Sequence, residues 1–472
     1  MPCRHAYRGQ DGRDDRCAAS HGSIQRGRLC PLQSLTDGTG DDPGSGPYRI
    51  PNAWIDTRAS YTNTIPTGAF RGAMTSQLTW ACEQQMDEIG VDLGIDPVEL
   101  RRRNLLREGD AYVTGERMHD VHFTELLNEV AGAIGSGIRS ESPEPGRVRG
   151  KGVALMIKST VTSSRSEARL RLGDDGRVTL LCSSVGMGQG VRTTLAQMTA
   201  GYMDVAIERV DVPFPDTAVT GFDTYTGSSR ATFSMGTALR KAAVVLREEL
   251  VSLASERMEA AVEDLAFSEG TIFLIGAPRH AISYQELLRS AGRSSIEADG
   301  VFQSEGGMPS LDPETGQGVA SVHWHEGAVG VEIEVDLETG RIRILNCHGA
   351  SYAGRVVSPS RVRQQNEGNI IFGLGQALFE EVIYDSGQLV NPNLSDYMIP
   401  SILDVPDRLT SSAVEGNDPE AEIHGIGEMT IPCIAPAIGN ALFAAAGIRL
   451  RDLPMTPERV LRALRAQGTT SL

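Results

Sequence analysis

Four short segments of this sequence carry residue types that could do chemistry. GMGQG at 186–190 follows an apolar run and precedes a helical pattern that begins at Val191. Free backbone N–H groups at a helix N-terminus favour an anion, and glycines let a phosphate approach the backbone. The segment is shorter than GxGxxG and lacks the acidic residue expected about 20 residues later. It therefore predicts either an anion site or an ordinary glycine turn.

Two further segments could also bind an anion at the start of a helix. TGSSR at 226–230 places hydroxyls before a helix expected to begin near Ser234, and GAFRG at 68–72 sets Arg71 between glycines before another helix. Both arrangements suit an anion. Each also has a structural interpretation, which is a polar loop for the first and a turn with a structural arginine for the second.

Glu428 is the strongest candidate for a general base. It lies in HGIGEMTIP at 424–432, among Ile426, Met429 and Ile431. Apolar neighbours would desolvate the carboxylate and raise its pKa, which suits a base that works near neutral pH. The alternative is a glutamate that caps a helix or lies in a solvated turn.

Other common sites are missing from the sequence. It contains no GxSxG, HExxH or GxxxxGK[ST] motif, and we expect His323, His325 and His348 to be core or surface histidines. The seven cysteines form no CxxC pair or Cys/His cluster, so we expect reduced thiols and neither a zinc site nor an iron–sulfur cluster held by this chain.

Composition excludes several classes of protein. The 472 residues include 44 Lys and Arg against 61 Asp and Glu, a net charge of -17, and no basic run supplies the face that a nucleic-acid binder needs. No apolar stretch is long enough for a membrane span, and the N-terminus lacks the apolar core of a signal peptide. We therefore expect a cytoplasmic protein with no nucleic-acid partner.

Strands and helices must position the four segments. They do not alternate regularly as βαβ units along the sequence, and this order predicts an α+β fold. Alternating apolar residues predict hairpins over 168–180 and 322–346. Residues 1–47 have few aliphatic side chains and no periodicity, so we expect them to be disordered or aberrant. Apolar spacing and proline starts predict helices over 78–89, 97–106, 191–202, 234–258, 361–380, 434–446 and 453–464.

The four segments, in this order, resemble the molybdopterin-binding large subunit of the xanthine dehydrogenase and aldehyde oxidase family. The likeness covers about residues 45–465 and extends to VEIEVDLETG and SPSRVRQQNEGNIIFGLGQALFEE. It implies two mixed α/β lobes of the molybdenum-cofactor-binding type. Residues 48–145 would be the remnant of a first molybdenum-binding domain, and residues 146–472 would form the second.

The resemblance also implies a molybdenum–molybdopterin cytosine dinucleotide cofactor, with the metal held by the pterin and by no protein side chain. Glu428 matches the catalytic base of the family. The positions that match cofactor-binding residues are Phe70, Arg71, Gly188, Gln189, Gly190, Ser228, Ser229, Gln365 and Gly427.

The reaction implied is hydroxylation of an aldehyde or an N-heterocycle with water as the oxygen donor. Electrons would pass to a 2Fe-2S cluster and an FAD on partner chains in a heteromeric complex. Ala73 occupies a substrate-binding position where purine-oxidising relatives carry Phe, which disfavours a purine. The loop GAFRGAMTS has no Cys, which disfavours carbon monoxide.

The sequence also departs from the family pattern. We find no GGFGGK-like turn with its additional pterin-binding glutamine, and His348 stands where an Asp is usual. Two hypotheses stay open. The chain is part of a functional large subunit, with a separate chain supplying the N-terminal half, or it is a truncated remnant or interaction subunit that binds no cofactor.

Overall fold

The computed structural model describes residues 4–10, 14–26, 44–61, 64–65, 68–135, 137, 139–140, 144–416 and 422–468. Its helices are α1 (Thr75–Leu93), α2 (Pro97–Asn104), α3 (Phe123–Ile134), α4 (Val191–Met203), α5 (Gly236–Met258), α6 (Tyr284–Ser290), α7 (Pro359–Leu378), α8 (Ile431–Ala446) and α9 (Pro457–Ala466). Its strands are β1 (Arg4–Gln10), β2 (Asp14–Arg26), β3 (Ala53–Tyr61), β4 (Arg139–Ser140), β5 (Arg147–Ser159), β6 (Arg165–Gly173), β7 (Val178–Cys182), β8 (Val210–Asp211), β9 (Leu265–Ser268), β10 (Thr271–Leu274), β11 (Ala277–Ser283), β12 (Ser295–Gln303), β13 (Trp324–Asp336), β14 (Ile342–Tyr352), β15 (Tyr384–Asp385), β16 (Gln388–Leu389) and β17 (Arg408–Val414).

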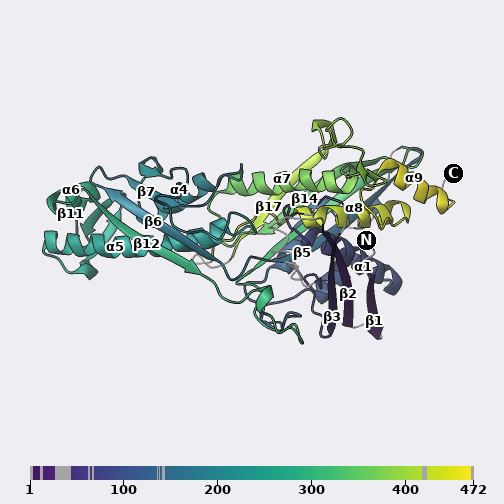
Figure 1. The fold of residues 1–472 in the computed structure, drawn as a ribbon, viewed down its shortest axis with the longest axis horizontal. Coiled ribbons are helices and arrows are strands. Elements are labelled where there is room, and N and C mark those ends of the chain that lie inside the picture. The colour runs from purple at the N-terminus through teal and green to yellow at the C-terminus, as the bar shows by residue number, and fades with distance from the viewer. Residues whose placement is uncertain are drawn as a thin grey trace.

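The molecule is elongated, with one lobe at each end (Figure 1). The first lobe holds a sheet in the order β12-β6-β7-β8, and the second holds a sheet in the order β17-β14-β13-β5-β4. This arrangement confirms the predicted α+β class and the two mixed lobes.

The first lobe is built on the predicted hairpin of β6 and β7, which pair antiparallel from Ala168 with Cys182 to Leu172 with Val178. Alternate residues of β6 are buried against α5, as a strand with one covered face requires. Helix α5 lies very close to β12, because a Cβ at Gly300 would lie 2.0 Å from the Ala238 carbonyl oxygen.

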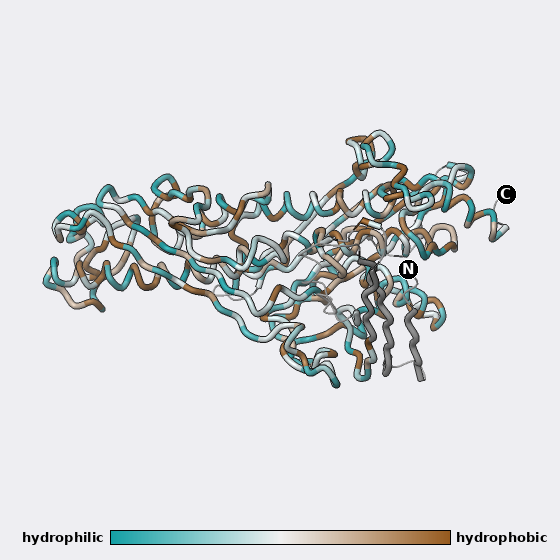
Figure 2. The backbone as a smooth tube through the Cα atoms, in the orientation of Figure 1, coloured by the Kyte–Doolittle hydropathy of each residue, from teal (hydrophilic) through white to brown (hydrophobic). Residues whose placement is uncertain are grey.

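The second lobe is built on the other predicted hairpin, β13 with β14, and on β5, which pairs antiparallel along the whole of β13. Helix α3 packs against these strands, and so does α8, whose residues are mostly hydrophobic (Figure 2). A Cβ at Gly152 would lie 2.2 Å from the Ala437 carbonyl oxygen, so glycine permits the close approach of β5 and α8.

The predicted helices are present, with boundaries shifted by a few residues. Helices α3 and α6 have no counterpart in the prediction. Before α5, Ala231–Met235 forms a π-helical turn directly after the TGSSR segment. A π-turn widens the backbone at the helix start and is frequent at functional sites.

Asp96 caps α2, as the Asp-Pro pair predicts. Its Oδ1 accepts hydrogen bonds from the backbone N–H groups of Val98 (2.9 Å) and Glu99 (3.0 Å). We expect Asp96→Ala to lower the free energy of unfolding by about 1 kcal/mol, since two N–H groups lose their partner. Chemical denaturation measures this change. Asp92→Ala, an exposed position at the end of α1, is the control and should leave stability nearly unchanged.

Several other predictions bear on the rest of the fold. Within residues 1–47 the structure describes the strands β1 and β2, and residues 1–3, 11–13 and 27–43 lie outside the described residues. The expected disorder of residues 1–47 stays a prediction. The domain boundaries at residues 47 and 145 also stay predictions. Cys82, Cys182, Cys347 and Cys433 are buried and form no disulfide within the described part of the chain, in agreement with the expected reduced thiols. Among the described residues, no helix combines the length and the apolar character that crossing a membrane requires.

Candidate cofactor and active site

One cavity of about 200 Å³ brings together segments that are far apart in the sequence. Its wall is formed by the TGSSR segment, the GMGQG turn, the start of α7 and the segment 423–428. Seven of the residues predicted from the sequence lie in its wall, and they are Arg71, Gln189, Ser228, Ser229, Gln365, Gly427 and Glu428.

The Glu428 carboxylate is held by partners from three other segments. Its Oε2 lies 3.1 Å from the Lys158 ammonium and accepts a hydrogen bond of 3.1 Å from the Ser229 hydroxyl. The Gly72 backbone also donates to this carboxylate, so the GAFRG turn reaches the same group.

The prediction of a raised pKa for Glu428 is wrong. Burial does raise the pKa of this carboxyl, but the charge of Lys158 and the hydrogen bonds from Lys158, Gly72 and Ser229 outweigh it and lower the pKa below its usual value. Glu428 is therefore an ionised carboxylate at neutral pH, in the form that accepts a proton.

Lys158 is a site residue that sequence reasoning missed, as it missed Arg355 and Arg361 in the cavity wall. It lies near the end of β5 with 1% of its side chain exposed, and it also donates to the Ser159 carbonyl (2.9 Å) and the Ser228 hydroxyl (3.0 Å). A signal was present, because Lys158 is a lone charge at the end of the apolar run GVALMIKS and the chain has few lysines. A buried charge requires a partner.

Ser228 and Ser229 adopt left-handed backbone conformations, with φ of 52° and 54°. Such angles strain non-glycine residues and persist where the surroundings enforce them. The Ser228 hydroxyl accepts from the Val161 N–H (3.1 Å), and Arg230, which follows Ser229, is buried in an ion pair with Asp223 (2.7 Å). These contacts aim the Ser229 hydroxyl at Glu428.

The GMGQG turn is closed by its own glutamine. The Gln189 Nε2 donates to the Val185 carbonyl (2.8 Å), and its Oε1 accepts from the Met187 N–H (2.6 Å). Gly188 and Gly190 have φ of 101° and 83°, which other residues rarely adopt, and Gly190 precedes the first turn of α4.

The cavity fits an anionic group rich in hydrogen-bonding atoms. The buried Oε1 of Gln365 has no hydrogen-bond partner among the described residues and lies 3.9 Å from the position of a Cβ on Gly427. Arg71, Arg355 and Arg361 also line the cavity. Together with the N-terminus of α4, these groups can hold phosphate and polar ring atoms.

Four predicted residues are not among the described residues that line the cavity. Gly188 and Gly190 adjoin it through the Gln189 turn, and Ala73 follows Gly72 without reaching the wall. Phe70 is 49% exposed and packs edge-on against Phe372, with ring centroids 5.5 Å apart. Their proposed cofactor and substrate contacts stay predictions.

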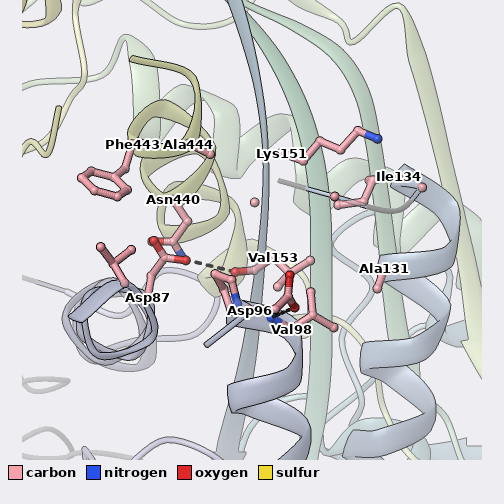
Figure 3. A pocket seen from close by; sticks show the side chains of 15 residues that line it. Asp87, Asp96, Val98, Ala131, Ile134, Lys151, Val153, Asn440, Phe443 and Ala444 are labelled. Atoms are coloured by element: carbon pink, nitrogen blue, oxygen red, sulfur yellow. Dashed lines mark hydrogen bonds between the residues drawn. The ribbon is translucent and has the colours of Figure 1, made fainter. Parts of the chain in front are cut away.

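A second cavity of about 260 Å³ lies between α1, α3, β5 and α8 (Figure 3). Asp87, Lys151 and Asn440 contribute polar atoms to its wall, and Phe443 contributes an apolar ring. None of the cofactor-binding, substrate-binding or catalytic residues predicted from the sequence lines it. Across the described part of the chain, no group of three or more His, Cys, Asp or Glu side chains could hold a metal ion.

Comparison with known proteins identifies the family. The model of a molybdopterin cofactor-binding domain matches residues 136–406, more than half of the chain, and a second model of the same description matches residues 35–105. The chain belongs to the molybdopterin cofactor-binding family. Membership of the xanthine dehydrogenase and aldehyde oxidase group, predicted from the sequence, is confirmed by the relatives that it matches.

Curated relatives of this family member include the putative xanthine dehydrogenase molybdenum-binding subunit of Escherichia coli K12, 32% identical over 87% of this chain and 55% of the relative. The 6-hydroxypseudooxynicotine dehydrogenase complex subunit gamma of Paenarthrobacter nicotinovorans is 30% identical over 90% of this chain and 54% of the relative. The chain thus spans about half the length of these relatives.

The fold of the chain matches that of solved structures. Quinoline 2-oxidoreductase from Pseudomonas putida 86 superposes with a TM-score of 0.84 at 24% identity, over 96% of this chain and 60% of that one. This likeness supports the fold of the two lobes. The function has to be argued from the residues of the cavity around Glu428.

Proposed function

We propose that this chain holds a molybdenum–molybdopterin cofactor in the cavity around Glu428 and acts as the molybdenum-binding part of a hydroxylase. The observation that carries the proposal is the convergence of seven predicted residues from distant segments on one cavity, around an ionised carboxylate. The relatives, which are molybdenum-binding subunits of oxidoreductases, support the same function.

In this proposal the arginines and the N-terminus of α4 bind phosphate, while Gln365 and the Ser228–Ser229 backbone hold the pterin. When bound, the cofactor supplies two-electron oxidation of a carbon with water as the oxygen source. Glu428 accepts the proton released in that step, and Lys158 and Ser229 keep its carboxylate ionised and oriented.

The finer parts of the proposal are the cytosine dinucleotide form of the cofactor, an aldehyde or N-heterocycle as substrate, and iron–sulfur and FAD subunits as electron acceptors. A cytoplasmic location belongs with them. They rest on the resemblance in the sequence and on the names of the relatives.

The cofactor is tested directly by elemental mass spectrometry for molybdenum and by release of CMP on acid hydrolysis. The chain is purified with the products of neighbouring genes from a host that makes the cofactor. We expect about one molybdenum and one CMP per folded chain. A folded chain that contains neither would instead support the non-catalytic remnant.

Replacement of Lys158 tests the electrostatic control of Glu428. In Lys158→Met the carboxylate loses its cation while burial remains, so the pKa of Glu428 rises and the acidic limb of the kcat/KM profile moves to higher pH. We expect kcat/KM near pH 5 to fall about 10-fold, with a smaller loss near pH 8. The exposed Lys241→Met is the control. An equal loss at every pH would contradict this role.

A further inference from the structure

Arg71 is a partly buried cation that lines the cavity around Glu428. Its Nη1 donates to the Asn369 Oδ1 (2.9 Å), and this is its one side-chain hydrogen bond among the residues that the structure describes. No carboxylate of those residues forms an ion pair with it. A guanidinium has five N–H donors, and a buried charge is costly unless a partner offsets it. Arg71 therefore has donors and a positive charge left for a bound anion.

Two residues of α7 fix the position of this cation. Asn369 is fully buried, and its Nδ2 has no partner in the described part of the chain, so its side chain bonds there to Arg71 alone. An apolar residue would avoid the unpaired donor, so packing by itself does not explain an asparagine here. Three residues later, Phe372 faces the guanidinium, with 5.0 Å between the Arg71 Cζ and the ring centroid. Asn369 and Phe372 are therefore positioning residues for Arg71.

Arg71 lies at the Glu428 end of the cavity. The next residue, Gly72, donates a backbone hydrogen bond to the Glu428 carboxylate. Burial lowers the pKa of Arg71, and the charge of Glu428 partly offsets this effect, so the two charges are close enough to interact. Glu428 is already paired with Lys158 at 3.1 Å. The positive charge of Arg71 therefore lies beside the proposed base without being neutralised by it.

Arg361 lies in a different part of the cavity wall. A Cβ on Gly190 would be 3.2 Å from the Cδ of Arg361, so this arginine is beside the N-terminus of α4, where free N–H groups suit a phosphate. Arg361 belongs to the first turn of α7, and Asn369 lies roughly 12 Å further along the same helix, at about 1.5 Å per residue. The cavity therefore has two separate regions for anions, and Arg71 belongs to the one beside Glu428.

We propose that the Arg71 side chain binds a carboxylate of the substrate, so that the substrate is an aldehyde or an N-heterocycle that carries a carboxylate group. The inference rests on the proposed function, because a substrate is turned over only where the cofactor is bound. A planar guanidinium can donate two parallel N–H bonds to a carboxylate, which fixes the orientation of the bound molecule. Since Arg71 adjoins Glu428, this contact orients the substrate relative to the base.

The substrate class is tested with matched pairs of compounds in the cofactor-loaded complex. One pair is para-formylbenzoate with para-formylbenzamide, and the other is isonicotinate with isonicotinamide, so the members of a pair differ in the charge of one group. In at least one pair we expect kcat/KM to be at least about 10-fold higher for the carboxylate, mainly through a lower KM, because the amide loses the charge-assisted bonds. Calorimetric binding of terephthalate gives a second readout that needs no turnover.

Arg71→Met removes the charge and all five donors. We expect the preference for the carboxylate to disappear and the dissociation constant of terephthalate to rise at least about 10-fold, while molybdenum content stays near that of the unaltered complex. Arg71→Lys keeps the charge without the planar fork, so it should restore the preference only in part. Asn369→Leu releases the guanidinium and should lower the preference by a smaller factor. Arg363→Met, a 72% exposed position of α7, is the control and should keep the full preference.

Three results would overturn this assignment. The molybdenum-loaded complex shows no preference in either pair or turns over none of the four compounds, or the preference survives in Arg71→Met. The third is loss of molybdenum from a folded Arg71→Met, because Arg71 would then hold the cofactor. If Arg71→Met does not fold, Arg71→Lys and Asn369→Leu decide the question. Failure of the proposed function is distinct, because the unaltered complex would then contain no molybdenum.

Discussion

Glu428→Gln is expected to abolish turnover while molybdenum content stays near that of the unaltered protein. Glutamine has the shape of glutamate and can keep the contacts with Ser229 and Lys158, but it cannot accept the proton. Loss of a general base costs about 10²–10⁴-fold in rate. Steady-state kinetics with aldehydes and N-heterocycles, together with elemental analysis of the same preparation, measure both quantities.

Glu367→Gln is the matched control for this substitution. Glu367 is a partly exposed residue of α7 that pairs with Arg363 at 3.6 Å, so its neutralisation should leave rate and metal content unchanged. The role of Glu428 as base is wrong if activity survives in Glu428→Gln. It is also wrong if cofactor and activity disappear together, because the residue would then act in binding.

Gly425→Ala is expected to remove the cofactor altogether. A Cβ at this position would lie 1.7 Å from the Ser229 carbonyl oxygen, a backbone atom that no side-chain rotation can move away. The segment that carries Glu428 must then separate from the Ser228–Ser229 loop, and the cavity wall between them opens. We expect molybdenum and CMP per chain to fall at least about 10-fold, with a loss of about 1–3 kcal/mol in stability from the steric conflict.

Gly201→Ala makes the same chemical change in an open place. Gly201 is exposed in α4, and a Cβ there would meet no described atom within 4 Å. Its cofactor content should match that of the unaltered protein, and its stability should be equal or up to about 1 kcal/mol higher, because alanine favours a helix more than glycine does. Normal cofactor loading in Gly425→Ala would show that the contact between these two segments does not hold the cavity together.

Much of the local structure was determined by the sequence alone. Alternating apolar residues specify the β6–β7 and β13–β14 hairpins, since a half-buried strand repeats every second residue. The Asp-Pro pair at 96–97 specifies the start of α2, because capping depends on residues adjacent in the chain. The order of the glycine-rich segments also indicated the family and seven residues of the cavity.

Only the tertiary structure decided the electrostatics of the site. Lys158 and Glu428 are far apart in the sequence, so no local pattern could place an ammonium 3.1 Å from the carboxylate and reverse the expected direction of its pKa. The contacts of the His323 ring with the rings of His325 and His424 likewise depend on tertiary structure, because His424 is about 100 residues away along the chain. Periodicity acts between neighbours along the chain, whereas Coulomb energy and desolvation depend on distances in space, which folding sets.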